Sequence, residues 1–444
     1  MRGGQKSMQQ RLLRRSSDSA PVLLELFSPK MNDPPSYGTF IEFEICEAKG
    51  LRMAVFSYFW NIYRFSGLRV PLAKGGESTR RRVTRRARRA RWIVAVLILF
   101  LLLYRVVFRF FTLKNMGFSY EWTLVLIELC LAVHCFVSAA TLFLWNRRGL
   151  LKEFLRAVST TSAHKTIGIA NVVSIGPYKV LFTLNVIITL LAEVFRTTDT
   201  LLEATWGKYL IGRPLFLHEQ LYPLEVLLNF YSLGISLTAV ALFYLMTSLM
   251  FAEFRQFNKE LSLAATNQRL QDEEVFRSFS NRHFDLLHLL RKVNIQVGVF
   301  VTTTIGTGLL VHFFAMFILT NFAESSSWAG IVTCSLLFFT GSGFAVAPMH
   351  RAAALISEAH ESSQILLFEK SVGETLRTNE CMQMVEFYKK RMIGRLRKGE
   401  YYVKILRAFN LTPSSASTIY LVAFLMGLAL STLGSKLVHK DDET

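Results

Sequence analysis

The chain has 444 residues, of which 51% are hydrophobic, and its mean hydropathy is +0.32. Such a composition excludes an ordinary soluble domain, since the apolar residues gather in long uninterrupted stretches. The formal net charge of +19 would suit a nucleic-acid-binding protein, but the basic residues lie beside the apolar stretches, so we expect no nucleic acid as partner. We predict an all-α, polytopic membrane protein that contacts membrane lipid.

Seven apolar stretches are long enough to cross a bilayer, because a hydrocarbon core about 30 Å thick needs roughly 20 helical residues. They are Trp92–Leu113, Ser119–Leu144, Val172–Phe195, Leu221–Phe251, Val297–Thr320, Ala329–Pro348 and Ser415–Leu433. A backbone exposed to lipid must satisfy its own hydrogen bonds, so each stretch is predicted to be a helix. The resulting organisation is a basic N-terminal region (1–91), helices one to six with their loops (92–348), a cytoplasmic helical link (349–414), the seventh helix (415–436) and an extracellular tail (437–444).

Lys and Arg residues gather on one side of these spans. Residues 1–91 and the links after the second, fourth and sixth spans hold 42 of the 51, whereas the other loops hold 6. Loops rich in Lys and Arg stay in the cytoplasm, which predicts the N-terminus inside and the C-terminus outside. The run Arg80–Arg91 directly precedes the first span and is predicted to contact anionic lipid. Arg105 and Arg109, in the outer half of that span, are interpreted as snorkelling to the outer interface.

Polar residues interrupt the second to fifth spans. Because polar groups are costly in the bilayer, they tend either to line a cavity or to meet a partner helix, and both interpretations stay open. As candidates for a ligand pocket we take Glu128, His134, Asn185, Asn229, Tyr231, Thr303, Thr307 and His312.

The seventh span carries small residues at every fourth position, which places them on one helical face. Such a face lets helices approach closely, and it can equally line a pore whose apolar neighbours form a constriction. The candidates for a pore or gate are Tyr420, Ala423, Met426, Gly427, Leu430 and Ser431.

The start of this span, from Thr418 to Leu425, resembles the last-helix signature of the invertebrate gustatory-receptor family. That signature is Thr-Tyr, five apolar residues and Gln-Phe. Tyr420 and the five apolar residues Leu421–Leu425 match it, whereas Ile419 stands where Thr belongs and Met426-Gly427 where Gln-Phe belong. Together with the topology of residues 90–436, this resembles a divergent member, similar to the nematode branch that includes light-sensing receptors.

The resemblance implies a sensory receptor of the plasma membrane, in the dendrite or axon of a sensory neuron. It would be a ligand-gated, non-selective cation channel with a small-molecule pocket in each subunit. The assembly would be a homotetramer, or a hetero-oligomer with related receptors, with the seventh helices around the pore. An alternative on the same scaffold is a photoreceptor or peroxide sensor, for which the candidate light-sensing residues are Trp92, Trp122 and Trp328.

Three other classes are less favoured. A G-protein-coupled receptor requires the opposite orientation, and its Asp-Arg-Tyr and Asn-Pro-x-x-Tyr motifs are missing at the expected places. A transporter usually shows two similar halves, whereas seven spans without an internal repeat do not. The sequence shows no catalytic motif, metal-binding motif or phosphate-binding glycine loop, so we expect neither an enzyme nor a cofactor.

Overall fold

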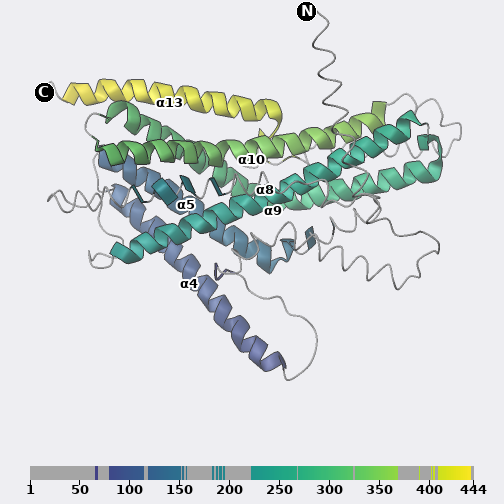
Figure 1. Ribbon diagram of the computed structural model, residues 1–444, viewed down its shortest axis with the longest axis horizontal. Helices are drawn as coiled ribbons and strands as arrows, with labels where there is room; N and C mark the ends of the chain where they lie inside the picture. Colours follow the sequence, from purple (N-terminus) through teal and green to yellow (C-terminus); the bar gives the residue numbers. More distant parts are fainter. Residues whose placement is uncertain are drawn as a thin grey trace, which may run out of the picture. The chain divides into compact units, whose positions relative to one another are not determined.

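The computed structural model describes residues 66–68, 80–114, 119–151, 222–267, 269–323, 326–368 and 409–441, with isolated residues within 153–195 and 390–405 (Figure 1). The chain divides into two units, Met1–Glu47 and Ala48–Thr444, and every described residue belongs to the second. The described elements are α4 (Arg80–Lys114), α5 (Tyr120–Arg147), α8 (Tyr222–Thr266), the 3-10 turn η4 (Arg269–Gln271), α9 (Glu273–Asn321), α10 (Trp328–Phe368), β1 (Lys404–Ile405), β2 (Phe409–Asn410) and α13 (Pro413–Asp441).

Five of these helices are long and apolar enough to cross a membrane, within Arg89–Lys114, Tyr120–Arg147, Pro223–Thr266, Glu273–Asn321 and Trp328–Ser362. The apolar stretch of α13, Ser414–Ala429, is shorter. The chain is therefore a helical membrane protein, and these helices coincide with the first, second, fourth, fifth, sixth and seventh predicted spans. The third, Val172–Phe195, lies largely outside the described residues, so the number of seven stays a prediction.

Local side chains set where the helices begin. Ser119 precedes α5, and its side chain accepts a hydrogen bond from the backbone N–H of Trp122 at 3.2 Å. Before α13, the Thr412 hydroxyl accepts from the Ser415 N–H at 3.1 Å, and the Ser415 hydroxyl accepts from the Thr412 N–H at 2.7 Å. Pro413 occupies the first helical position, where a missing N–H costs nothing. This reciprocal pair is the capping-box arrangement and fixes the start of α13.

Helices α8, α9 and α10 are longer than the bilayer is thick. They contain 45, 49 and 41 residues, and at 1.5 Å per residue each is about 60–75 Å long. The sequence placed the ends of the fourth and sixth spans at Phe251 and Pro348, yet α8 and α10 continue to Thr266 and Phe368. Pro348 lies inside α10 and donates no backbone hydrogen bond to the helix. The apolar stretch thus marks the part of each helix that can span the membrane, while the helix itself extends beyond that part.

A small antiparallel hairpin precedes α13. Strands β1 and β2 pair Lys404 with Asn410 and Ile405 with Phe409. The sequence predicted a helical link over 349–414, so this hairpin is a local departure from that prediction. Ile405 and Phe409 are of the β-branched and aromatic types that favour strands.

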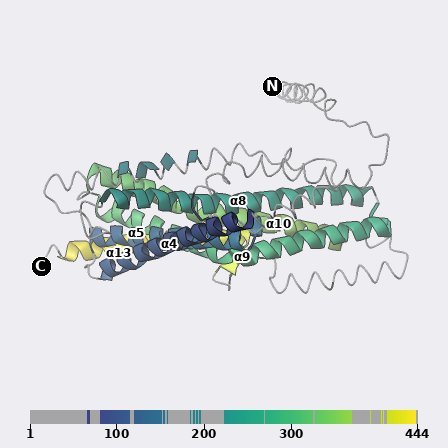
Figure 2. The same cartoon turned by 90° about the horizontal axis from the view of Figure 1, so that it is seen from below.

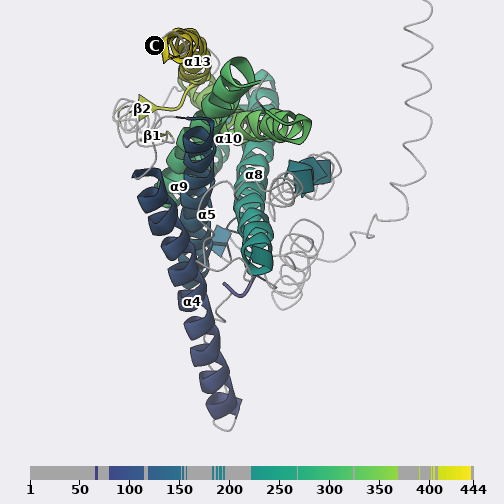
Figure 3. The ribbon, with the colours of Figure 1, turned by 90° about the vertical axis from the view of Figure 1, so that its left-hand side faces the viewer.

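The helices of this unit pack side by side. Helix α10 packs against α9 and α8, α5 against α9, α4 and α8, and α13 against α9 and α10. Figures 2 and 3 show α4 beside α5, and Figures 1 and 3 show α13 at the edge of the bundle beside α10. The largest fully buried side chains include Trp145, Phe243, Phe254, Phe257 and Phe300.

Helices α9 and α10 approach most closely at two glycines. A Cβ added at Gly308 would lie 2.8 Å from the Gly341 carbonyl oxygen and from the Ala345 nitrogen. A Cβ added at Gly341 would lie 2.6 Å from the His312 nitrogen. Because these neighbours are backbone atoms, no larger residue fits without moving a helix. A Cβ added at Gly427 of α13 would lie 2.9 Å from the Phe313 ring of α9.

Candidate ligand pocket

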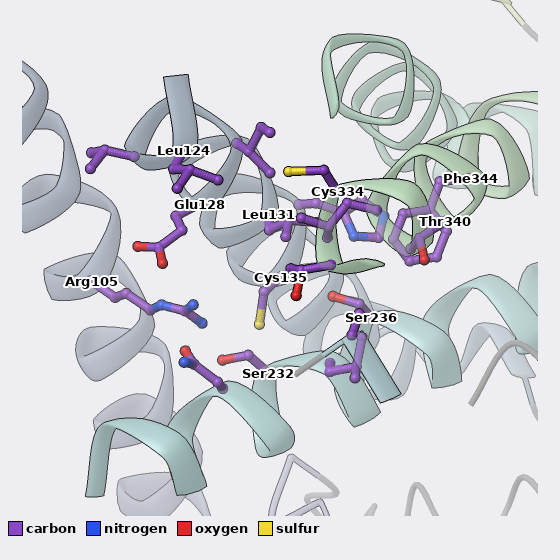
Figure 4. A pocket seen from close by; sticks show the side chains of 18 of the residues that line it. Arg105, Leu124, Glu128, Leu131, Cys135, Ser232, Ser236, Cys334, Thr340 and Phe344 are labelled. Carbon is purple, nitrogen blue, oxygen red and sulfur yellow. The ribbon is translucent and has the colours of Figure 1, made fainter. Parts of the chain in front are cut away.

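A cavity of about 90 Å³ lies between helices α4, α5, α8 and α10 (Figure 4). Its residues come from the end of α4 and from the starts of α5, α8 and α10, so it occupies the half of the bundle opposite Arg80. The lining residues are Arg105, Tyr120, Leu124, Val125, Ile127, Glu128, Leu131, His134, Cys135, Ala192, Asn229, Ser232, Leu233, Ser236, Gly330, Thr333, Cys334, Leu337, Thr340 and Phe344.

The cavity has an apolar part and a polar part. Leucines from α5 and α10, together with Phe344, supply the apolar surface. Figure 4 shows Arg105 reaching from α4 toward the space between Glu128 and Ser232. A site with a few polar groups on a mostly apolar surface is typical of pockets for small organic molecules.

A buried ionic cluster lies beside the polar part. Arg109 Nε lies 2.9 Å from Glu128 Oε2, and its Nη2 pairs with Glu225 Oε1, so one guanidinium joins α4, α5 and α8. Arg105 and Arg109 are only 5% and 4% exposed. The interpretation of these arginines as snorkelling residues is therefore wrong. Their side chains point into the bundle, where carboxylates neutralise Arg109, because an unpaired charge in that position would be very costly.

His134 connects the cavity to α9. Its Nε2 lies 3.2 Å from the Thr304 hydroxyl, which itself donates to the Phe300 carbonyl at 2.8 Å. Since that hydroxyl proton is already used, Nε2 is the donor and Nδ1 of the neutral ring is an acceptor. The imidazole also stacks on Phe344 of α10, with ring centroids 4.7 Å apart. One side chain thus contacts both helices of the glycine crossing.

Three of the eight predicted pocket residues line this cavity, namely Glu128, His134 and Asn229. The others that the structure describes make different contacts. The Tyr231 hydroxyl donates to the Ser66 carbonyl, and the Thr307 hydroxyl donates to the Thr303 carbonyl at 2.7 Å. His312 Nδ1 bonds the Ser342 hydroxyl at 2.7 Å. Asn185 lies outside the described residues.

The pore candidates lie on α13. The Tyr420 ring centroid lies 6.4 Å from that of His312, so α13 contacts α9, the helix that packs closely on α10 at Gly308. Gly427 is buried against α9, whereas Met426 is 55% exposed on the other side. A groove of about 940 Å³ separates α13 from α10, with Tyr420 and Phe424 in its wall. The side chains of Ala423, Leu430 and Ser431 lie outside the described part of the structure.

The three candidate light-sensing tryptophans lie away from the cavity. Trp92 and Trp328 are 50% and 64% exposed, and Trp122 is half-buried in the first turn of α5. The Trp328 ring meets Phe195 edge to face, with centroids 5.8 Å apart. None of the three belongs to the lining of the cavity. Within the described residues, no group of three or more His, Cys, Asp or Glu side chains could hold a metal ion.

Residues 55–427 match a protein-family model described as a Caenorhabditis protein of unknown function, DUF267. The chain belongs to this family. Comparison of the DUF267 chain with curated proteins finds no match.

Two solved structures resemble this DUF267 chain over most of its length. The structure of the insect olfactory receptor OR5 from Machilis hrabei has a TM-score of 0.61 and 11% sequence identity, covering 86% of this chain and 99% of OR5. The same receptor in complex with eugenol gives a TM-score of 0.61 and 12% identity, covering 86% and 100%. The DUF267 chain therefore has the fold of an insect olfactory receptor.

Sequence reasoning missed several lining residues of the DUF267 chain, above all Arg105 and Thr333. A signal for Arg105 was present, because two arginines one turn apart in an apolar span require acidic partners in other spans. Thr333 gave no such signal, since threonine is common in membrane helices and usually bonds its own backbone. Glu225 completes the ion cluster, but the sequence does not show which carboxylate meets these arginines.

Proposed function

We propose that this protein is a chemosensory receptor of the plasma membrane, a ligand-gated, non-selective cation channel that responds to a small molecule bound between α4, α5, α8 and α10. The observation that carries the proposal is this cavity, which mixes apolar and polar surface within a bundle that has the fold of an insect olfactory receptor. One structure of that receptor is a complex with eugenol, a small organic molecule. The proposal places this chain beside the gustatory and olfactory receptors in one superfamily.

A continuous set of contacts leads from the cavity to α13. His134 bonds Thr304 on α9, and α9 crosses α10 at Gly308. One turn further along α9, His312 lies against Tyr420, and Phe313 lies against Gly427. A ligand that binds more tightly to one arrangement of α9 and α10 shifts the bundle toward it, and α13 follows. Tyr420 and Gly427 are thus the contacts through which binding reaches the gate.

The channel requires several copies of the chain, with α13 of each around a central pore. The exposed side of α13 carries Leu421, Phe424, Leu425 and Met426, which are 41–57% exposed. Such a surface faces either lipid or another subunit. We propose a homotetramer, or a hetero-oligomer with related receptors, in which Met426 lies near the gate together with Ala423, Leu430 and Ser431.

We also propose seven spans with the N-terminus inside. Helix α4 begins at Arg80 and continues without a break into its apolar stretch, so the basic run lies at one end of a membrane helix. Contact with anionic lipid on the cytoplasmic side would hold that end. Antibody access to an N-terminal tag only after cells are permeabilised supports this orientation, and access on intact cells overturns it.

Whole-cell recording from cells that express the full chain tests the channel. The panel holds sugars, bitter compounds, peroxide and eugenol, together with smaller compounds such as butan-1-ol and butanone that suit a cavity of about 90 Å³. An active compound is expected to evoke a cation current that reverses near zero voltage. Untransfected cells give the control. A purified protein that runs as a monomer, binds compounds of the panel and passes no current in bilayers would overturn the proposal.

The light-sensing alternative is less favoured, because the three tryptophans lie outside the cavity. It predicts currents on ultraviolet or blue illumination without added ligand. If such currents occur, Trp328→Phe tests the residue that packs against Phe195. Currents that survive this substitution remove Trp328 from the mechanism.

A further inference from the structure

Several side chains line the cavity with polar atoms that have no hydrogen-bond partner in the described part of the structure, among them Ser232 and His134. Two others, on different helices, matter most here. They are Asn229 on α8, with both Nδ2 and Oδ1, and Thr333 on α10, with its hydroxyl. Asn229 is 3% exposed and Thr333 is 4% exposed. A buried polar atom without a partner is costly, and one in the wall of a cavity can form its hydrogen bond with a molecule that enters. In contrast, the Thr340 hydroxyl, also in the lining, donates to the Leu336 carbonyl at 2.8 Å.

The amide of Asn229 offers both a donor and an acceptor. A molecule in the cavity can therefore use either a hydroxyl group or a carbonyl group to bond it. The Nδ1 acceptor of His134, which is also buried without a partner in the described region, adds a second place for a hydroxyl proton. A purely apolar ligand would leave all of these atoms unsatisfied.

The charges around the cavity already balance. Arg109 pairs with Glu128 and Glu225, and Arg105 is buried in the lining beside them, which gives two positive and two negative groups around the cavity. A carboxylate or an ammonium group would add an unbalanced charge in a site of low polarity, and this is costly. The ligand is therefore uncharged.

The volume limits the size of the ligand. An engineered cavity of about 150 Å³ admits benzene, whereas this cavity has about 90 Å³. A ligand therefore has fewer non-hydrogen atoms than the six of benzene, and about four carbon atoms with one oxygen is the upper limit. Leu337, in the apolar part of the lining, sets one limit, because it is 8% exposed and packed among other buried side chains.

We propose that this cavity selects a small, uncharged molecule with one hydroxyl or carbonyl group on a short apolar chain, and that Asn229 is the residue that recognises the oxygen, with Thr333 in support. The inference rests on the proposed function only in taking this cavity as the ligand site.

Ligand-observed NMR on the purified full chain in lipid nanodiscs tests the chemical class. The probes are butan-1-ol, butanone, butyrate, butylammonium and pentane. Butan-1-ol and butanone are expected to bind at least tenfold more tightly than the other three. Equal or tighter binding of butyrate or butylammonium would overturn the requirement for an uncharged ligand. Tighter binding of pentane would overturn the requirement for an oxygen. If no probe binds, the whole inference is overturned.

Two substitutions test the residues. Asn229→Leu keeps the branched shape and the number of side-chain non-hydrogen atoms and removes the amide, so butan-1-ol binding is expected to weaken about tenfold or more. Ser138→Ala is the matched control, because Ser138 is also buried with an unpartnered hydroxyl in the described region but does not line the cavity. The Ser138→Ala variant is expected to bind butan-1-ol as tightly as the wild type. Butan-1-ol binding by Asn229→Leu at wild-type strength would overturn the role of Asn229.

A third variant, which is expected to bind a larger ligand, excludes the explanation that loss of binding reflects misfolding. Leu337→Ala enlarges the apolar part, so the preferred alcohol is expected to shift from butan-1-ol to hexan-1-ol. An unchanged preference would contradict this location of the ligand. If the alcohols bind as expected but evoke no current, the channel proposal fails while this inference stands. If only charged compounds evoke currents, the channel proposal stands and the inference of an uncharged ligand fails.

Discussion

Helix α8 carries two buried asparagines whose surroundings differ. Asn258 is 4% exposed, and its Nδ2 donates to both the carbonyl and the carboxylate of Glu358, at 3.0 and 3.1 Å. The Ser362 hydroxyl donates to its Oδ1. Asn229 is 3% exposed, yet its amide has no partner in the described residues and lies in the wall of a cavity.

The difference separates two uses of a polar residue inside a helix bundle. At Asn258 the amide joins α8 to α10 beyond the apolar stretch, where full hydrogen bonding contributes to stability. At Asn229 the same side chain is left for something that enters the cavity. In the proposed function, Asn229 therefore gives up stability for binding, whereas Asn258 does not.

The largest expected effect comes from the ion cluster, in which Arg109 pairs with carboxylates of two other helices at the cavity end. Arg109→Leu removes the guanidinium that pairs with Glu128 and Glu225 inside the bundle, so stability is expected to fall by about 3–5 kcal/mol. Thermal unfolding in detergent measures it. Lys292→Met is the control, since its pair with Glu153 is exposed and worth less than about 1 kcal/mol. A small effect at Arg109 would mean that this end tolerates unpaired groups in general, and Asn229 would lose its significance.

The glycine crossing comes next, because it holds α9 and α10 beside the cavity at a fixed distance. Gly308→Ala places a methyl group 2.8 Å from backbone atoms of α10, and this overpacking is expected to cost about 3 kcal/mol. Gly306→Ala on the same helix meets nothing within 4 Å and is expected to stabilise by about 0.5–1 kcal/mol. Equal unfolding temperatures for the two variants would show that the crossing adapts and that the cavity has no fixed volume.

The two asparagines can be compared directly. Asn258→Leu removes the partner of Glu358 and Ser362 and is expected to destabilise by about 2 kcal/mol. Asn229→Leu removes atoms that have no partner, so without ligand it is expected to be neutral or stabilising. Chemical unfolding of both variants in the same detergent tests the contrast. Similar losses at the two positions would show that Asn229 has a structural role after all.

Part of this architecture could be predicted from sequence. Apolar length predicts the spans because hydropathy is a local property. The paired arginines of α4, which we interpreted as snorkelling, could have indicated a need for acidic partners. Which carboxylates answer that need depends on how α4, α5 and α8 face one another, so Glu128 and Glu225 could not be assigned. The extension of α8 to Thr266 was less evident, since its last turns are polar and are held by contacts such as that of Asn258.

The cavity shows the same limit. Asn229 could be selected as a candidate because an amide in an apolar span is unusual. Asn258 lies beyond that span, where an amide is ordinary, and only its partners reveal its role. Tyr231 and His312 gave the same signal as Asn229, yet they bond other helices or loops. A polar residue in a span thus predicts an interaction, and the three-dimensional structure decides whether the partner is protein or ligand.

The smallest expected effect concerns α13, whose start depends on Thr412. Thr412→Ala removes one half of the reciprocal cap with Ser415, and loss of such a cap costs about 1 kcal/mol. Because α13 touches the bundle mainly through α9 and α10, fraying at its start is expected to leave unfolding of the bundle nearly unchanged. Hydrogen exchange of the first turns of α13 should rise about fivefold for that free energy, while exchange in α5 stays the same. A matching rise of hydrogen exchange in α5 would show that α13 and the cavity end of the bundle unfold together.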